Sequence, residues 1–428
     1  MSVPSPEELD RELAAFFARG VSTPGATSPA AASDETAFDS LALRLFAWQY
    51  EALPAYRLYC QRRGALPQRL RHWSEIPAVP VAAFRDARLL GEEDGSVPEP
   101  VRVFRTSGTT TGGARAGEHA FSAAALALYH ASLVPTFRAF VLPELAPGRT
   151  SDLVPLVLGP PADDAPHSSL WHMVEVLGHE LFADEPRHFL TAGPPAGEGA
   201  AALDAEGLAR ACDAAAGAVR PVCLFATDLA LDRFLSVVDT SGWRVRLPAG
   251  SRLMHTGGAK GRLSAVDPAA LYARVESRLG IASTSCVNEY GMTELASQFY
   301  DDVLVSGAAG GTSAAAPPRL KFGPSWVRAL VVDVHTLEPL PAGRPGLLRI
   351  VDLANRGSVM AILTEDRAVA EVPAGPGAPG AEASPAVGPR PCALPFRLLG
   401  RAPGSDTRGC SLDAEAMGAV ESASGART

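Results

Sequence analysis

The stretch at residues 104–119 contains the residue types that bind phosphate groups. It reads FRTSGTTTGGARAGEH and directly follows the apolar run at 101–104. Backbone N–H groups in a glycine-rich loop converge on an anion, and Ser and Thr hydroxyls add donors at little steric cost. The positions that we expect to cradle a phosphate are Thr106, Ser107, Gly108, Thr109 and Thr110. The loop lacks the Gly-Lys-Ser/Thr ending of a Walker motif, and the alternative interpretation is a flexible polar surface loop.

A second stretch, NEYGMTE at 288–294, brings an aromatic ring, a hydroxyl and a carboxylate together. A carboxylate suits a hard cation such as Mg²⁺, whereas the neutral hydroxyl of a threonine binds a phosphoryl oxygen without adding negative charge. Taken alone, this stretch is equally typical of a turn followed by a capped helix. Its interpretation changes when both stretches are considered together.

Both stretches, in this order, resemble the adenylate-forming superfamily, which contains acyl-CoA synthetases, firefly luciferase-like enzymes and the adenylation domains of peptide synthetases. The resemblance implies ATP and Mg²⁺ as cofactors. It places Tyr290 and Gly291 at the nucleotide, with the Tyr290 ring against the adenine. It assigns the α-phosphate to Thr293 and the magnesium ion to Glu294.

Three further segments fit the same resemblance. HTGGAKG carries Gly257 and Gly258, which resemble the glycine turn at the adenine pocket. ILTEDRA resembles the segment whose aspartate binds the ribose hydroxyls, so Asp366 is the expected ribose ligand. LLGRAPG resembles the Gly-Arg hinge before a small C-terminal domain, which places Arg401 near ribose and phosphate. Without the lysine of that small domain, Lys260 or Arg401 is expected to supply the cation for the reacting phosphate, with Arg115 as a third candidate.

The C-terminal region resembles one branch of this superfamily. The chain ends shortly after Arg401, and its segments WSEIPAVPVAAF and RGCSL resemble the LuxE-type acyl-protein synthetases, or long-chain-fatty-acid–luciferin-component ligases. That resemblance implies that a fatty acid is activated as acyl-adenylate, transferred to Cys410 and delivered to a reductase partner; bioluminescent members also work with an acyl-transferase. Arg401 and Arg408 would lower the pKa of the Cys410 thiol, and Cys392 is the alternative acceptor. The residues expected to be catalytic are therefore Cys410, Lys260 and Arg401.

Two other functions remain open. An acyl-CoA or aryl-CoA ligase would release acyl-CoA and leave Cys410 unmodified; the expected lack of the small domain that builds the CoA tunnel argues against it. A non-catalytic subunit would bind nucleotide only, or scaffold a reductase complex. A non-catalytic subunit would be expected to have lost residues of the nucleotide site. This chain keeps four of them together: Thr293, Glu294, Asp366 and Arg401.

The segment after the phosphate loop also contains residues of interest. Ser122 is the expected cap of a following helix, whose N-terminal dipole would add to the attraction for an anion. His119 is expected either to contact phosphate or to lie on the surface at a helix start. Further along, His172 in SSLWHM either lines an acyl pocket or caps local backbone.

These motifs require an α/β scaffold. From residue 100 to 300, short apolar runs alternate with alanine-rich stretches, which indicates βαβ units and a substantially parallel sheet. Residues 327–334 and 346–352 flank a Pro/Gly turn and predict an antiparallel pair. We therefore expect the large N-terminal domain of an adenylate-forming enzyme, with layered sheets and helices and a truncated C-terminal small domain. The expected parts are a helical region at 1–100, an adenylation core at 101–395 with a disordered insert at 373–391, and a vestigial C-terminal segment at 396–428.

The N-terminal region predicts helices separated by irregular segments. Ser5 is the expected cap of the first helix, because proline and glutamate follow it at favourable positions. A second helix over 38–63 is expected to break near Pro54. We expect a mobile loop at 21–35 and extended chain at 73–84.

Composition excludes several classes of partner. The 428 residues carry a net charge of −9 without a Lys/Arg cluster, which argues against nucleic acid or an anionic membrane surface as the partner. The six cysteines are scattered without a CxxC pair, which argues against a zinc site. The N-terminus lacks an apolar signal segment and the longest apolar run is too short to span a membrane, so we expect a reduced, cytoplasmic protein.

Overall fold

The computed structural model describes residues 3–21, 29–91, 96–106, 116–190, 202–257, 267–306, 319–372 and 394–402. Its helices are α1 (Pro6–Phe17), α2 (Pro29–Ala52), α3 (Pro54–Arg62), α4 (Ala83–Asp86), α5 (Ala123–Val141), α6 (Ser169–Leu181), α7 (Ala205–Gly217), α8 (Asp228–Ser241) and α9 (Pro268–Leu279), with 3₁₀ turns η1 (Trp73–Glu75) and η2 (Ser283–Ser285). Its strands are β1 (Val79–Pro80), β2 (Arg102–Arg105), β3 (Glu118–Phe121), β4 (Val154–Leu158), β5 (Arg187–His188), β6 (Val222–Thr227), β7 (Arg252–Thr256), β8 (Cys286–Tyr290), β9 (Phe299–Tyr300), β10 (Val327–Val332), β11 (Pro345–Asp352), β12 (Ala361–Ala370) and β13 (Phe396–Arg401). The insert expected at 373–391 lies outside the described residues.

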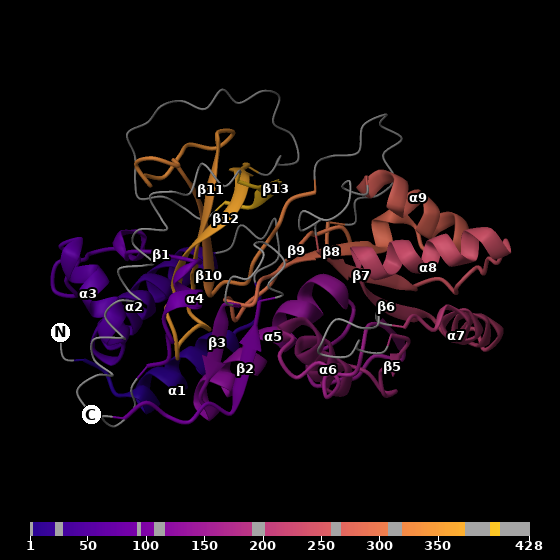
Figure 1. The fold of residues 1–428 in the computed structure, drawn as a ribbon, viewed down its shortest axis with the longest axis horizontal. Helices are drawn as coiled ribbons and strands as arrows, with labels where there is room; N and C mark the ends of the chain where they lie inside the picture. Colours follow the sequence, from indigo (N-terminus) through magenta and orange to yellow (C-terminus); the bar gives the residue numbers. More distant parts are fainter. Residues whose placement is uncertain are drawn as a thin grey trace.

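A six-stranded sheet confirms the predicted βαβ alternation. Its order is β5-β4-β6-β7-β8-β9, and only β9 runs antiparallel to its neighbour. Every residue of β4 is buried, as expected for a parallel strand covered on both faces. Buried side chains of α7, α8 and α9 pack on one face of this sheet, and those of α5 and α6 pack on the other. Figure 1 shows the ribbons of these helices next to the sheet.

A second, five-stranded sheet carries the predicted antiparallel pair. Strands β10 and β11 are antiparallel, with Val327 opposite Asp352, and β11 continues to β12. The first part of β12 pairs with β1 in parallel, and its second part pairs with β13 in antiparallel orientation. The sheet therefore joins residues near the N-terminus to β13, which begins at Phe396.

The N-terminal helices confirm part of the prediction. The Ser5 hydroxyl accepts a hydrogen bond from the Glu8 backbone at 3.2 Å and caps α1, and the second helical stretch is divided at Pro54 into α2 and α3. The expected loop at 21–35 is wrong over its second part, because α2 already begins at Pro29. The segment at 73–84 was expected to be extended, but η1 and α4 give it two helical turns.

The apolar run at 101–104 does not join the parallel sheet. It forms β2, which pairs antiparallel with β3 in a separate two-stranded sheet, with Phe104 opposite His119. The Ser122 hydroxyl caps α5 as predicted, accepting a hydrogen bond from Ala125 at 3.3 Å. However, β3 lies between the predicted phosphate loop and α5. The loop is thus followed by a strand and not directly by a helix. Because residues 107–115 lie outside the described part of the chain, the contribution of the helix dipole stays a prediction.

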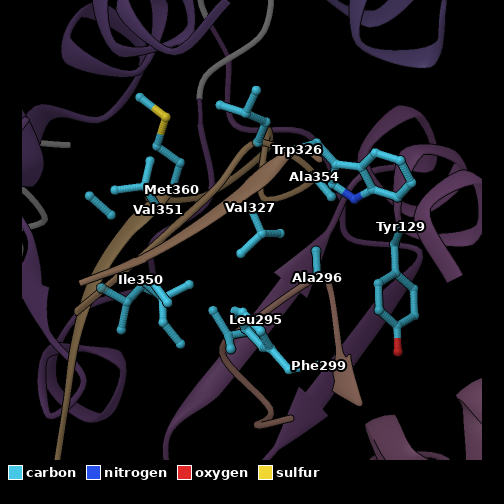
Figure 2. Close-up of a cluster of buried hydrophobic side chains, with 14 of the residues drawn as sticks. Tyr129, Leu295, Ala296, Phe299, Trp326, Val327, Ile350, Val351, Ala354 and Met360 are labelled. Atoms are coloured by element: carbon cyan, nitrogen blue, oxygen red, sulfur yellow. The ribbon is translucent and has the colours of Figure 1, made fainter. Parts of the chain in front are cut away.

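A shared apolar core supports the segment that follows β8. Figure 2 shows Leu295, Ala296 and Phe299 from this segment beside Tyr129 of α5 and residues of β10 and β11. Leu295 is 2% exposed and Ala296 is fully buried. This packing fixes the chain immediately after Thr293 and Glu294, two of the predicted site residues.

One described helix, α5, is long and apolar enough to cross a membrane by length and composition. Half of its most apolar window is buried inside the protein. Its buried side chains, among them Leu133 and Phe137, belong to the core shared with α1 and α6. This burial is what a core helix requires.

Candidate functional site

The two large sheets meet at Tyr290, Asp366 and Arg401. Tyr290 ends β8, and its phenol donates a hydrogen bond of 2.8 Å to the Asp366 carboxylate on β12. Asp366 lies opposite Arg401 in the register of β12 and β13, and the Arg401 Nε is 3.9 Å from a carboxylate oxygen of Asp366. Burial, followed by the negative charge of Asp366, raises the pKa of Tyr290 well above its ordinary value, so the phenol remains a donor.

Arg401 forms the exposed rim of this group. Its side chain is 43% exposed, and its guanidinium lies 3.3 Å from a carboxylate oxygen of Glu365. The guanidinium carries five N–H donors, and these two carboxylate contacts leave donors directed toward solvent. Arg401 can therefore contact an anionic ligand while it stays next to Asp366.

Thr106 and Glu294 both lie close to Gly117. The Thr106 hydroxyl accepts a hydrogen bond from the Gly117 N–H at 2.9 Å, and the Thr106 N–H donates to the Gly117 carbonyl at 2.9 Å. A Cβ placed on Gly117 would lie 3.5 Å from the Thr106 hydroxyl oxygen and 3.6 Å from a Glu294 carboxylate oxygen. The predicted phosphate loop thus begins within a few ångströms of the predicted metal ligand.

Glu294 is also close to the first group of residues. It is 6% exposed, and its negative charge contributes to the raised pKa of Tyr290. Thr106 and Glu294 thus lie near Gly117, while Tyr290 is hydrogen-bonded to Asp366, which lies beside Arg401. Residues that lie in or shortly after β2, β8, β12 and β13 are thereby brought into one neighbourhood; their roles toward a nucleotide remain predictions.

His119 and Asn355 hold the backbone of Thr293 and Glu294 by hydrogen bonds. The sequence did not predict this role for either side chain. The His119 Nδ1 donates to the Thr293 carbonyl at 2.9 Å, and the Asn355 amide donates to the Glu294 carbonyl at 2.9 Å. His119 is 1% exposed, and burial lowers its pKa to about 4, so the imidazole is neutral. The expectation that His119 lies on the surface at a helix start is wrong, because it is a buried residue of β3.

Glycine is required at two positions of the predicted adenine site. Gly257 follows β7 with φ of +105°, a conformation that side chains rarely adopt. A Cβ on Gly291 would lie 2.3 Å from a Glu289 carboxylate oxygen. That carboxylate is held by the Thr256 hydroxyl, so the backbone after β8 approaches it closely only because position 291 lacks a side chain.

Several predicted site residues lie outside the described part of the chain. They are Ser107, Gly108, Thr109, Thr110, Gly258, Lys260 and Cys410. Their roles remain predictions. The described neighbours Thr106 and Gly257 place the starts of the two corresponding segments at the carboxyl ends of β2 and β7.

The four described cysteines are structural, as expected. Their thiols are buried and free, and burial raises the pKa of each to about 12. A thiol with such a pKa is a poor nucleophile at neutral pH. The four residues are Cys60, Cys212, Cys223 and Cys286.

His172 pairs with a second histidine. Its Nε2 lies 2.8 Å from the Nε2 of His130 on α5, and its ring packs against Phe104. Burial lowers the pKa of His172 to about 4, with the neighbouring His130 adding to the effect. This hydrogen bond is to a side chain, so the interpretation of His172 as a cap of local backbone is not supported.

The described residues fit a magnesium ion better than a metal held by protein alone. In the described ranges, no group of three or more His, Cys, Asp or Glu side chains could hold a metal ion. Mg²⁺ commonly uses one or two carboxylates together with substrate phosphates and water. The Glu294 carboxylate beside the Thr106 hydroxyl offers this kind of hard oxygen donor.

Comparison with known proteins establishes the fold. No family model matches the sequence, and no curated protein sequence matches it. A solved open conformation of 2-hydroxyisobutyryl-CoA ligase with 2-HIB-AMP and CoA is similar, with a TM-score of 0.54 and 15% identity over 89% of this chain and 80% of that one. The same ligase in its postadenylation state with 2-HIB-AMP gives a TM-score of 0.56 and 15% identity, covering 89% and 72%.

These similarities confirm the predicted fold class. The chain shares the mixed α/β architecture of this CoA ligase over 89% of its length. At 15% identity the likeness concerns the fold.

Proposed function

We propose that this protein uses ATP to activate a carboxylic acid of the fatty-acid class as an acyl-adenylate. The observation that carries the proposal is the neighbourhood of Thr106, Glu294, Tyr290, Asp366 and Arg401, to which the two large sheets and the β2–β3 pair contribute. It combines a hydroxyl, a carboxylate suited to Mg²⁺, an aromatic ring, a ribose acceptor and a cation. Together these groups can bind the adenine, the ribose and the phosphates of ATP, and the Mg²⁺ that accompanies them.

Each residue has a defined task in the first reaction. Asp366 accepts hydrogen bonds from the ribose hydroxyls, while the Tyr290 ring lies against the adenine. Thr106 and Thr293 contact phosphate oxygens, and Glu294 with Thr106 would hold Mg²⁺, which supplies positive charge to the crowded phosphate oxygens. A carboxylate oxygen of the acid attacks the α-phosphorus, the bond from the α-phosphorus to the bridging oxygen breaks, and pyrophosphate leaves.

A cation at the α-phosphate stabilises the charge that develops in this step. Arg401 is the described candidate, because its guanidinium is partly exposed next to Asp366. Lys260, three residues after Gly257, is the second candidate.

In the second reaction the acyl group moves to a cysteine of the enzyme. The thiolate of Cys410 attacks the acyl carbonyl, a thioester forms, and AMP leaves with the electrons of the broken carbon–oxygen bond; the thiol proton passes to solvent. The burial of the four described cysteines supports Cys410, or Cys392, as the acceptor. We propose that the acyl-enzyme then delivers its group to a reductase partner, with an acyl-transferase as a further partner, in the cytoplasm.

A second candidate function is an acyl-CoA or aryl-CoA ligase. It is favoured by the similarity to a ligase solved with CoA. A CoA ligase would transfer the acyl group to the CoA thiol and leave Cys410 free. A third, non-catalytic candidate would bind nucleotide within a reductase complex and release no pyrophosphate.

One experiment separates these three functions. The protein is incubated with ATP, Mg²⁺ and a panel of fatty and aromatic acids, with and without CoA, while pyrophosphate release and intact mass are measured. Acyl-protein synthesis predicts acid-dependent pyrophosphate and an acyl adduct that is absent in Cys410→Ser. Free acyl-CoA without an adduct favours the ligase, and absence of pyrophosphate with every acid contradicts both enzymatic functions.

A further inference from the structure

Residues 319–322, here called the bridging segment, are hydrogen-bonded to both large sheets. The Lys321 N–H donates to the Phe396 carbonyl on β13 at 2.7 Å, and the Phe396 N–H donates to the Lys321 carbonyl at 3.3 Å. The next residue, Phe322, makes two backbone hydrogen bonds with Tyr300 of β9, at 2.8 and 2.9 Å. The bridging segment thus lies between the five-stranded and the six-stranded sheet.

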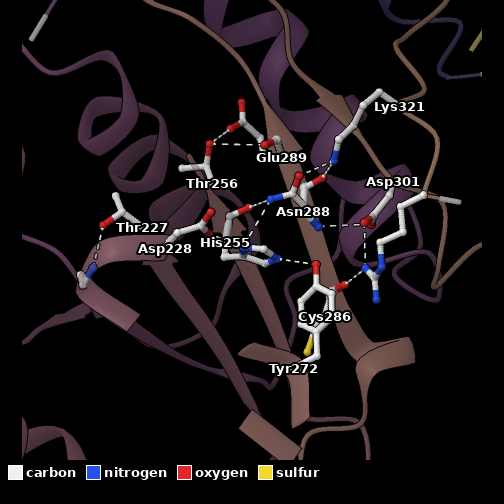
Figure 3. A network of polar contacts seen from close by, with 12 residues as sticks. Thr227, Asp228, His255, Thr256, Tyr272, Cys286, Asn288, Glu289, Asp301 and Lys321 are labelled. Carbon is white, nitrogen blue, oxygen red and sulfur yellow. Dashed lines mark hydrogen bonds and ion pairs between the residues drawn. The ribbon is translucent and has the colours of Figure 1, made fainter. Parts of the chain in front are cut away.

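The Lys321 side chain adds a third attachment, to β8. Its ammonium donates to the backbone carbonyl and to the side-chain oxygen of Asn288, both at 2.6 Å (Figure 3). The Asn288 amide in turn donates to the His255 carbonyl on β7 at 3.3 Å. Asn288 is two residues before Tyr290, so the ammonium fixes β8 close to the point where it enters the candidate site.

The choice of lysine at this position is unusual for this chain. Lys260 and Lys321 are the two lysines among 38 basic residues. Lys321 is 4% exposed, and a compact ammonium with three donors can bond both oxygens of one asparagine, which the planar guanidinium of arginine does with a different geometry. The neighbouring Arg319 instead donates to the Cys286 carbonyl at 2.5 Å and to Asp301 at 2.8 Å.

Charged groups from every side act on the Lys321 ammonium. Burial lowers its pKa to about 8, and the positive charge of Arg319 acts in the same direction. The carboxylates of Asp301, Glu289 and Asp228 oppose this change. The ammonium is therefore charged at neutral pH. It loses its proton as the pH rises through about 8, within the pH range in which binding can be measured.

We infer that Lys321 is a positioning residue of the candidate nucleotide site, because it holds β8 and β13 at the separation at which Tyr290 reaches Asp366. Phe396, its backbone partner, packs edge-on against the Tyr290 ring at 5.8 Å. Strand β13 then runs from Phe396 to Arg401, opposite Asp366. The inference rests on the proposed function only where nucleotide affinity is the measured quantity.

The test compares Lys321→Met with Lys321→Arg and with Arg210→Met, which removes an exposed cation from α7. ATP affinity is measured by calorimetry from pH 7 to 9.5, well below the melting temperature. We expect Lys321→Met to weaken ATP binding at pH 7 by at least tenfold, Lys321→Arg to weaken it less, and Arg210→Met to leave it unchanged. Wild-type affinity is expected to fall as pH rises through about 8, whereas the affinity of Lys321→Met stays constant.

Backbone hydrogen exchange without nucleotide provides a second measurement that does not depend on the proposed function. In Lys321→Met, amide exchange is expected to accelerate both at 286–290 and at 396–401. A lower melting temperature of Lys321→Met would not by itself support the inference. The inference is overturned if the variant has the ATP affinity of the wild type, the same pH dependence of that affinity, and unchanged amide exchange in both strands. If wild-type protein binds no ATP, the proposed function fails; exchange that then accelerates in only one of the two strands overturns the inference as well.

Discussion

The Tyr290 phenol and the Asp366 carboxylate are 2.8 Å apart although 76 positions separate them in the chain. Tyr290 ends a strand of the six-stranded sheet, and Asp366 lies in the five-stranded sheet. The hydrogen bond thus closes the junction between the two sheets at the point where the predicted ribose and adenine ligands meet. A nucleotide bound there would contact both sheets, and its affinity would depend on their alignment.

The ribose contact gives the first prediction. Asp366→Asn is expected to weaken ATP binding by at least tenfold, because a neutral amide accepts hydrogen bonds from ribose less strongly than a carboxylate. The affinity for 2′,3′-dideoxy-ATP should hardly change, since that analogue lacks both hydroxyls. Calorimetric titration with both nucleotides measures the difference. Asp213→Asn, at an exposed position of α7, is the control; equal losses for both nucleotides would contradict the assignment.

The metal ligand gives the second prediction. Glu294→Gln removes the negative charge of a side chain that is 6% exposed, while the amide retains its size. We expect acid-dependent pyrophosphate release to fall by at least a hundredfold, on the order of 3 kcal/mol of transition-state stabilisation, with a higher Mg²⁺ requirement. Glu206→Gln, whose side chain is 89% exposed, should behave as wild type. An unchanged Mg²⁺ dependence in Glu294→Gln would exclude Glu294 as the ligand.

Cysteine reactivity gives the third prediction. The native protein should react rapidly with iodoacetamide only at Cys392 and Cys410, because the other four thiols are buried with pKa values of about 12. Peptide mass spectrometry locates the adducts, and the denatured protein should react at all six positions. Prior incubation with ATP, Mg²⁺ and the acid should protect Cys410. Protection of Cys392 alone would move the acceptor to that residue.

Asp352 gives a prediction for the pH dependence of stability. Its fully buried carboxylate accepts hydrogen bonds from Ala296, Ser297 and Ala354, and burial raises its pKa from 3.8 to about 6. A raised carboxyl pKa means that the stabilisation is complete below pH 4 and is lost as pH rises through about 6. The loss amounts to about 3 kcal/mol, at about 1.4 kcal/mol for each pKa unit.

Denaturant unfolding of Asp352→Asn measures this effect. The variant is expected to be less stable than wild type at pH 4, because its amide N–H₂ faces backbone donors. Its disadvantage should shrink between pH 4 and pH 7, since only the wild type loses the stabilisation. A constant difference in the free energy of unfolding across this range would show that Asp352 does not titrate as described.

The sequence predicted the elements whose signals are local. The apolar run of β4 and the alternation with alanine-rich helices indicated the parallel sheet, and the Pro/Gly turn indicated the pairing of β10 with β11. The motif residues Tyr290, Asp366 and Arg401 were correctly expected to lie together. In each case the residue types and their order in the chain were sufficient to predict the element or the contact.

Contacts over long sequence distances could not be predicted in the same way. The run at 101–104 has the composition of a parallel strand, and only the hydrogen bonds of β3 show that it forms a hairpin. His119 and Lys321 bond to backbone carbonyls that are 174 and 33 positions away. A single buried polar residue leaves no periodic pattern, so its role as a support becomes visible only with its partner.

The most direct test of the account is a crystal structure of the protein with ATP or AMP. The account predicts one nucleotide between the two sheets, with its ribose hydroxyls on Asp366, its adenine against Tyr290 and its α-phosphate beside Thr106 and Thr293. A nucleotide bound elsewhere on the protein, or a site between Glu294 and Arg401 that stays empty at saturating ATP and Mg²⁺, would contradict the central claim.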